Sequence, residues 1–179
     1  MEIEAGNSDE LLDKFYQMLI VTRRRHRLPL QRILWFRNLV KCLGPRVKIW
    51  VASHEGRPVA SIVTLSHKNT LIYKYGSSDP EFLKLNGTVA LFWAAIQEAK
   101  GEGLTQFDLG RSDLDNQGLI TFKDRWGAER LELTYRRSTR EPASKSTGGK
   151  VGALTSLAFP RMPESLLVFA GKVLYRHKG

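Results

Sequence analysis

The residues whose chemistry is most suggestive lie in one stretch of the sequence, between Phe107 and Gly127. Asp108 falls at the end of a short apolar run, and Lys123 stands among aromatic residues further on. A carboxylate at a strand end can orient or deprotonate an amine, and a lysine can bind a phosphate or a carboxylate. Loops that follow buried strands often carry binding and catalysis. We therefore take Asp108 and Lys123 as candidate catalytic residues.

Each candidate also has a purely structural explanation. Asp108 can pair with Arg111, and Lys123 can be an ordinary surface lysine. Strict alternation puts Tyr73 and Tyr75 on one side of a strand and Lys74 on the other. One of these sides belongs to the core, so either the tyrosines or the lysine line a groove. Trp126 is expected to be a core residue.

The elements that position these residues follow from the apolar pattern. Helices with one apolar face are predicted over 9–25, 30–43 and 88–100. Ser8 is a plausible N-cap for the first, and Pro29 suits the first turn of the second. Because the helix at 88–100 connects two strands, these strands should be parallel neighbours with a right-handed crossover. Alternating or apolar runs predict strands over 47–52, 58–66, 70–76, 104–110 and 131–136.

A pair of parallel strands that separates leaves a backbone edge on which an extended acyl or peptidyl group can lie. The helix that starts near Asn86 offers unpaired N–H groups to a phosphate. Acyl transfer needs an oriented amine, an acyl ester or thioester, donors for the oxyanion and a proton acceptor. The pattern is therefore compatible with acyl transfer at this edge.

Composition indicates a globular chain with anionic partners. The net charge is +10, the pI is about 9.9, and hydrophobic residues make up 42%. These values favour nucleic acid, nucleotide-linked sugars or an anionic membrane face. The densest cationic cluster is Arg23, Arg24, Arg25, His26 and Arg27.

The expected compartment is the cytoplasm. The single Cys42 cannot form an internal disulfide and is expected to be inert core filler. The N-terminus does not resemble a signal peptide, and no apolar run is long enough to span a membrane. The four histidines are scattered, so no metal site is predicted.

The chain is expected to divide into a domain over 1–137, a flexible linker over 138–162 and an amphipathic helix over 163–179. The last segment suits docking on the domain, on a partner or on an anionic bilayer surface. The third possibility implies peripheral contact with the inner face of the membrane.

Several motifs together resemble the FemAB-like branch of the GNAT acyltransferases, most closely the FemAB-related proteins of exosortase and exopolysaccharide loci. The similarity extends over nearly the whole chain, including the Arg23–Pro29 segment and the C-terminal amphipathic segment. The most specific part is a Phe-Lys-x-x-Trp-Gly-Ala pattern. The motifs that carry it are Tyr73–Ser78, Asn86, Trp93, Phe107–Ser112, Gly118–Leu119, Phe122–Lys123 and Trp126–Ala128.

The resemblance implies an α+β fold with a GNAT-like mixed central sheet flanked by helices, followed by a C-terminal amphipathic helix. It implies transfer of an acyl or aminoacyl group to an amine in peptidoglycan or exopolysaccharide biosynthesis. The donor would be aminoacyl-tRNA, acyl-CoA or an acyl carrier, and no cofactor is expected to be resident. The acceptor would be an anionic cell-wall or polysaccharide precursor, with no role for DNA. Residues assigned to substrate binding are Arg111, Tyr73, Tyr75, Asn86 and Phe122.

Two departures from the family pattern shape these expectations. FemAB proteins have two GNAT-like domains, whereas this chain resembles only the second. Either a homodimer or a partner would complete the acceptor site, or the chain is a degenerate or truncated remnant. The glycine loop that binds the coenzyme A pyrophosphate in ordinary GNATs is also absent from Asp79–Gly87. That absence disfavours acyl-CoA relative to aminoacyl-tRNA. The alternative is a non-catalytic GNAT-like module that binds an anionic ligand or a membrane surface.

Overall fold

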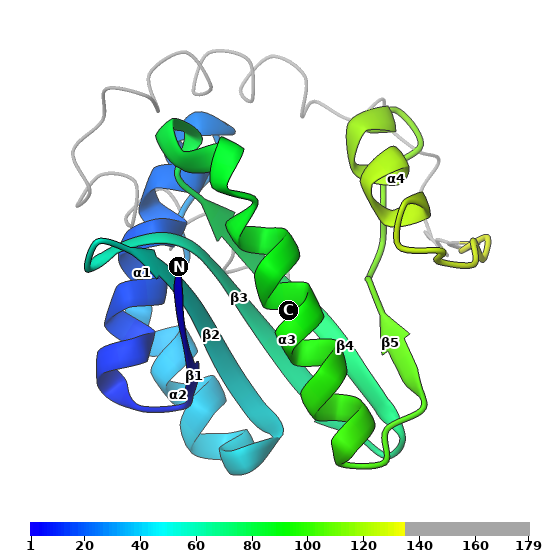
Figure 1. The fold of residues 1–179 in the computed structure, drawn as a ribbon, viewed down its shortest axis with the longest axis horizontal. Coiled ribbons are helices and arrows are strands. Elements are labelled where there is room, and N and C mark those ends of the chain that lie inside the picture. Colours follow the sequence, from blue (N-terminus) through cyan, green and yellow to red (C-terminus); the bar gives the residue numbers. More distant parts are fainter. Residues whose placement is uncertain (135–179) are drawn as a thin grey trace, which may run out of the picture.

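The fold is built on one five-stranded sheet in the order β1-β2-β3-β4-β5 (Figure 1). A computed structural model describes residues 1–134 of the chain. The pairs β1–β2, β2–β3 and β3–β4 are antiparallel, and the pair β4–β5 is parallel. The predicted mixed sheet and its parallel pair are confirmed. The strands are β1 (Glu2–Gly6), β2 (Val47–His54), β3 (Arg57–His67), β4 (Thr70–Ser78) and β5 (Gln106–Asp108).

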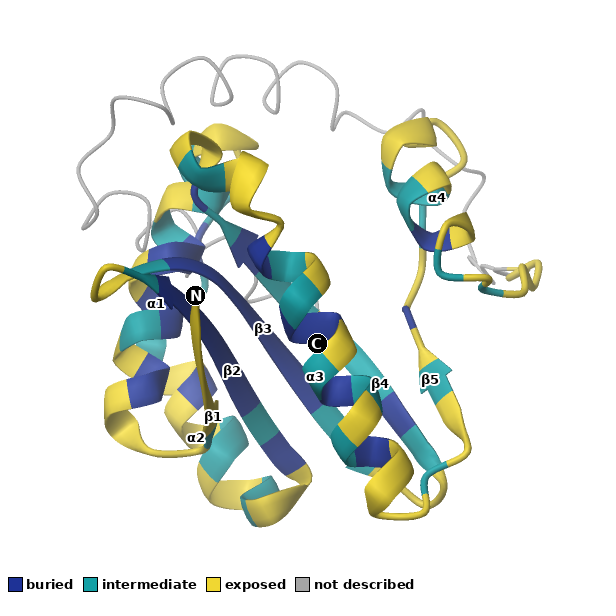
Figure 2. Cartoon of the chain, in the orientation of Figure 1, coloured by how far each residue is buried: buried dark blue, intermediate teal, exposed yellow. Residues whose placement is uncertain are grey.

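Helices cover both faces of the sheet. Helices α1 (Asp9–Arg25) and α2 (Ile33–Leu43) pack on one face, and α3 (Gly87–Gly101) packs on the other (Figure 1). The buried side chains follow this division, and Figure 2 shows the central strands as the most enclosed part of the chain. The remaining elements are the short helix α4 (Gln117–Asp124) and two 3₁₀ helices, η1 (Gly44–Arg46) and η2 (Pro80–Leu85).

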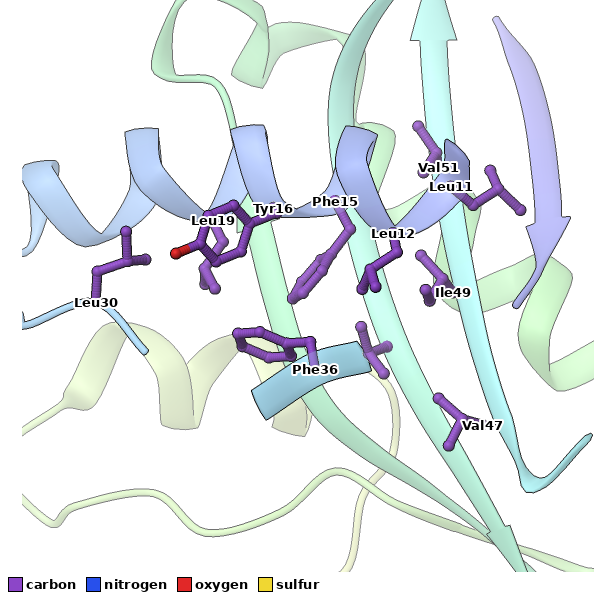
Figure 3. Packing of buried hydrophobic residues seen from close by; sticks show 11 residues of the cluster. Leu11, Leu12, Phe15, Tyr16, Leu19, Leu30, Phe36, Val47, Ile49 and Val51 are labelled. Atoms are coloured by element: carbon purple, nitrogen blue, oxygen red, sulfur yellow. The ribbon is translucent and has the colours of Figure 1, made fainter. Parts of the chain in front are cut away.

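The core between the sheet and α1 is aromatic at its centre. Phe15 and Phe36 are almost fully buried, and their ring centroids lie 5.2 Å apart in an edge-to-face arrangement (Figure 3). Leucines of α1 and valine or isoleucine side chains of β2 surround them. This helical face corresponds to the predicted spacing of apolar residues in α1, which Ser8 caps by accepting from the Leu11 N–H.

The second core places α3 in very close contact with the sheet. Leu91, Phe92 and Ala95 of α3 are fully buried. At the start of the helix, a Cβ added to Gly87 would lie 2.8 Å from the Cβ of Ala60 on β3. Because real Cβ atoms do not approach so closely, the first turn of α3 requires glycine at this position. The beginning of α3 is thereby fixed beside the end of β4.

Several boundaries differ from the sequence predictions. Helix α2 begins at Ile33 rather than near residue 30, because the preceding residues run extended and the Gln31 carbonyl accepts from the Tyr16 hydroxyl. Strand β1 was not predicted, since its apolar residues are few and its stability comes from backbone pairing with β2. Cys42 is exposed rather than buried, because it lies on the outer side of α2.

Two of the strands predicted after α3 also differ from the observed structure. Strand β5 is shorter than 104–110, because the chain turns at Asp108 and Gly110. The strand predicted over 131–136 is wrong for residues 131–134, which are irregular; alternation alone does not form a strand without a partner to bond to. Residues 135 and 136, the predicted linker and the amphipathic helix lie outside the described residues. None of the helices within residues 1–134 has the length and hydropathy needed to cross a membrane.

The close approach at Gly87 gives a stability test with an internal control. We expect Gly87→Ala to destabilise the fold by about 1–3 kcal/mol, because the added methyl overpacks the helix–sheet contact. Gly101→Ala, at the other end of α3, meets no atom within 4 Å and should stabilise by about 0.5–1 kcal/mol. Urea denaturation measures both variants. Equal effects of the two substitutions would contradict the packing explanation.

Candidate functional site

The candidate site lies where β4 and β5 separate. The two strands pair over only three positions, Thr70 with Gln106, Leu71 with Phe107 and Ile72 with Asp108. Beyond Ile72, β4 continues to Ser78 with β3 on one side and no described strand on the other. Figure 1 shows the chain after β5 leading away towards α4. Within residues 1–134, the backbone edge of β4 from Tyr73 onward therefore has no strand partner on the β5 side.

A β-bulge interrupts β4 at this edge and corrects one prediction. The register pairs Val63 with Tyr75 and Thr64 with Tyr73, so Lys74 is the extra residue. Because an extra residue reverses the side-chain alternation, the two tyrosines point to opposite faces of the sheet. Strict alternation had indicated that the two tyrosines lie on the same side of the strand, and this prediction is wrong. Lys74 is exposed.

Each tyrosine packs into a different core. The Tyr73 ring lies 4.8 Å from Phe92 of α3, and burial raises the pKa of its hydroxyl to about 12. Tyr75 packs with Phe36, at 5.3 Å between centroids, on the α1 and α2 face. The Tyr73 hydroxyl lies directly over Gly76, where a Cβ would overlap it. Tyr73 therefore lies on the α3 face of β4, and Tyr75 lies on the α1 and α2 face.

Asp108 shapes the loop that leaves β5. Its Oδ1 accepts a hydrogen bond from the Gly110 N–H at 2.7 Å, which closes a tight turn with Gly110 at a φ of 71°. The carboxylate remains exposed. The turn brings Gly110 beside β4, since a Cβ there would lie 3.4 Å from the Tyr73 carbonyl oxygen. Asp108 therefore sits at the point where the two strands part.

Lys123 is buried and holds the same loop from α4. Its Nζ donates to the Gly110 carbonyl at 2.6 Å and to the Arg111 carbonyl at 3.1 Å. Burial lowers the pKa of Lys123, and the charge of Asp108 opposes that change. The structure thus joins both candidate catalytic residues to one turn. In it, Lys123 acts as a clamp on the backbone, a role that the sequence did not predict.

The remaining predicted residues of this stretch divide between core and surface. Phe122 packs against Phe92, with 5.6 Å between ring centroids, so its ring belongs to the core. Trp126 packs against the same ring, as predicted. Arg111 is on the surface, with its Nε 3.5 Å from Asp113 Oδ1. Helix α4 was missed as a helix, although Asn116 supplies a recognisable N-cap by accepting from the Leu119 N–H.

The beginning of α3 lies near the end of β4, because Gly87 packs on Ala60, the β3 residue that pairs with Ser78. Asn86 is the N-cap residue in a left-handed conformation with a φ of 54°, and its side chain makes no capping hydrogen bond. The first N–H groups of a helix have no intrahelical acceptor and attract anions. Before it, η2 replaces a glycine loop, and Asp79 stabilises η2 by accepting from the Glu81 N–H. The pyrophosphate loop that the sequence lacks is thus also absent as a structure between β4 and α3.

Elsewhere in the described chain, neither a cavity nor a cluster of polar side chains forms an alternative candidate site. A hollow of about 30 Å³ lined by Lys48, Trp50 and Glu98 lies at the opposite end of the sheet and accommodates little more than a water molecule. Within residues 1–134, no group of three histidine, cysteine or carboxylate side chains is arranged to hold a metal ion.

Comparison with solved structures identifies the same fold in acetyltransferases. An aminoglycoside acetyltransferase from an uncultured soil metagenomic sample is 17% identical with a TM-score of 0.62, over 78% of this chain and 96% of that chain. The aminoglycoside 6'-N-acetyltransferase AAC(6')-IG from Acinetobacter haemolyticus is 15% identical with a TM-score of 0.60, over 79% and 100%. AAC(6')-Iy bound to a CoA bisubstrate analogue is 10% identical with a TM-score of 0.60, over 78% and 99%. At these identities the likeness concerns the fold alone.

The sequence itself matches a family profile. Curated protein sequences gave no significant match. Residues 1–124 match the family described as "Acetyltransferase (GNAT) domain", and this region contains the whole sheet, both flanking helical layers and α4. The chain belongs to the GNAT acetyltransferase family.

Proposed function

We propose that this protein is an N-acyltransferase that transfers an acyl or aminoacyl group from a phosphate-bearing donor to an amine. The observation that carries the proposal is the parting of β4 and β5 after Ile72 and Asp108, beside the uncapped start of α3. An extended acyl group fits the open backbone edge of β4. The donor's phosphate is then near the first N–H groups of α3.

The reaction assigned to this edge is a direct transfer. The amine nitrogen attacks the acyl carbonyl carbon, a C–N bond forms, and the C–S bond of a thioester or the C–O bond of an ester breaks. The oxyanion accepts from backbone N–H groups of β4, and the leaving thiolate or alkoxide takes up a proton. Backbone donors that are fixed before the reaction stabilise such an oxyanion strongly.

Asp108 at the end of β5 and Lys123 on α4 have distinct roles in this proposal. Asp108, exposed at the strand end, orients the amine and accepts its proton. Lys123 is a positioning residue that holds the Gly110 and Arg111 carbonyls. Direct contact of Lys123 with donor or acceptor, which the family resemblance implies, remains a prediction.

The finer assignment is a FemAB-like aminoacyltransferase that acts on an anionic cell-wall or exopolysaccharide precursor. The resemblance of the motifs and the net charge of +10 support it. The missing glycine loop supports aminoacyl-tRNA as donor, whereas the CoA bisubstrate analogue bound to the structurally similar AAC(6')-Iy supports acyl-CoA. Assays with both donors separate these possibilities.

A second candidate is a non-catalytic module that binds an anionic ligand. It is favoured by the structural roles of Tyr75, Phe122 and Lys123, which pack or clamp the scaffold. If neither charged tRNA nor acyl-CoA gives transfer to any amine under conditions where the protein binds the donor, this second candidate is preferred.

Removal of the Asp108 charge tests the proposed chemistry. Asp108→Asn keeps an oxygen that accepts from the Gly110 N–H, so the turn is retained. We expect kcat/KM for acyl transfer to fall by about 10²-fold or more, because the proton acceptor is lost. Asp115→Asn, an exposed carboxylate in the following loop, is the matched control and should leave the rate unchanged. Equal rates for wild type and Asp108→Asn would remove Asp108 from the mechanism.

Lys123→Met tests the clamp. Loss of both hydrogen bonds leaves two backbone carbonyls without their donor, so we expect destabilisation of about 1–3 kcal/mol in urea denaturation. Burial lowers the pKa of Lys123 from 10.5 in the folded state. Between the lowered pKa and 10.5, the unfolded chain therefore binds more protons at Lys123 than the folded chain does. The contribution of Lys123 to the stability of the wild type accordingly rises with pH in that range.

The difference in the free energy of unfolding between wild type and Lys123→Met should accordingly increase as the pH approaches 10.5. Lys84→Met, which removes a lysine from η2 instead, provides the control for general charge effects. A difference that decreases with rising pH would contradict the burial of the Lys123 ammonium.

A further inference from the structure

The densest cationic cluster of the sequence lies at the end of α1. Arg23, Arg24 and Arg25 form the last turn of the helix, and His26 and Arg27 follow directly. Arg27 has a φ of 54°, and the Leu28 N–H donates back to the Arg23 carbonyl, which stops the helix there. The backbone thus concentrates these side chains at one end of the sheet.

The cluster is attached to the end of β4. The Ser78 N–H donates to Thr22 Oγ1 at 3.1 Å, and Arg25 Nη2 donates to Ser78 Oγ at 3.3 Å. Helix α1 runs on the face of the sheet opposite to α3 (Figure 1). The arginines and the beginning of α3 are therefore near the same end of β4 but on different faces.

The positive charge of the cluster is not neutralised within residues 1–134. None of the ion pairs in that part of the chain involves Arg23, Arg24, Arg25 or Arg27. The carboxylate that follows Ser78, Asp79, is paired with Arg57 at 2.8 Å. Arg24 Nε is shielded from solvent and has no hydrogen-bond acceptor among the described residues.

Stabilisation of the helix dipole does not account for this arrangement. Cations in the last turn of a helix are favourable, but one or two suffice and the benefit is small at an exposed site. Here four arginines lie within five consecutive residues, so their like charges repel one another. Burial lowers the pKa of His26, and the charges of Arg25 and Arg23 lower it further. An anion with several acceptor oxygens would relieve the repulsion and satisfy Arg24.

We propose that Arg23, Arg24, Arg25 and Arg27, with Ser78, bind the diphosphate group of the acceptor. The forked guanidinium group matches phosphate oxygens, which it binds in a bidentate manner. The inference rests on the proposed function, because the start of α3 already serves the donor's phosphate on the other face. The acceptor class is a sugar or amino sugar that carries a diphosphate, such as a nucleotide-linked sugar.

The experiment is a calorimetric titration of the full chain with pyrophosphate and with UDP-N-acetylglucosamine. We expect Arg24→Gln/Arg25→Gln to weaken binding of both probes by at least about tenfold. The control variant is Lys41→Gln/Lys100→Gln, which also removes two exposed cations from last turns of helices, at the opposite end of the sheet. It should bind like wild type. Should the double variant fail to fold, Arg25→Gln alone replaces it, since Arg25 is exposed.

His26 provides a readout that does not depend on affinity. Binding of the diphosphate places negative charge beside His26 and should raise its pKa in an NMR titration. The rise should be absent in Arg24→Gln/Arg25→Gln.

The other outcomes overturn the proposal. An equal loss of affinity in the double variant and in its control would mean that the probes bind through nonspecific attraction to the positive charge of the protein. Tighter binding to phosphatidylglycerol vesicles or to an RNA hairpin than to the soluble diphosphates, lost in the same variant, would assign the cluster to a membrane or to RNA. Acyl transfer to an amine and binding of the diphosphate are measured in separate assays. Binding without any transfer removes the proposed function alone, and transfer to an amine without diphosphate binding removes this inference alone.

Discussion

The architecture depends on the short parallel contact between β4 and β5. Three pairs hold the strands together, and the turn at Asp108 and Gly110 then ends the pairing. If the contact were longer, the edge of β4 would be filled by its neighbour. If it were absent, the loop that carries Asp108 would have no fixed place. The bulge at Lys74 and the Lys123 clamp both act on this region, and the close contact of Gly87 with Ala60 fixes the start of α3 on the neighbouring β3.

The same constraint explains the distribution of polar groups. Opposite faces of the sheet present the start of α3 and the end of α1 near the end of β4, one with unpaired N–H groups and the other with guanidinium groups. The hydrophobic cores behind them are rigid, with Phe92 and Phe15 fully enclosed. In the proposed function, two anionic groups approach this strand end from different sides, the donor's phosphate at α3 and the acceptor's diphosphate at α1.

Much of this could be predicted from sequence because its signals are local. The apolar period of α1, the crossover through α3 and the parallel strand pair follow from spacing alone. The bulge could not be predicted in this way, since alternation across Tyr73 and Tyr75 reads the same with or without an extra residue. Lys123 was recognised as unusual, but its partners are backbone carbonyls, which leave no trace in residue types. Residues 131–134 show the reverse error, a strand pattern without a neighbouring strand.

The most direct test of the central claim is a crystal structure with a bound donor analogue, either a non-hydrolysable acyl-CoA or an aminoacyl-nucleotide. We expect the acyl carbonyl to lie against the backbone edge of β4 between Tyr73 and Gly76. We also expect the phosphate to lie within hydrogen-bond distance of the N–H groups that follow Asn86. An acyl group bound elsewhere, with the edge between β4 and β5 empty, would contradict it.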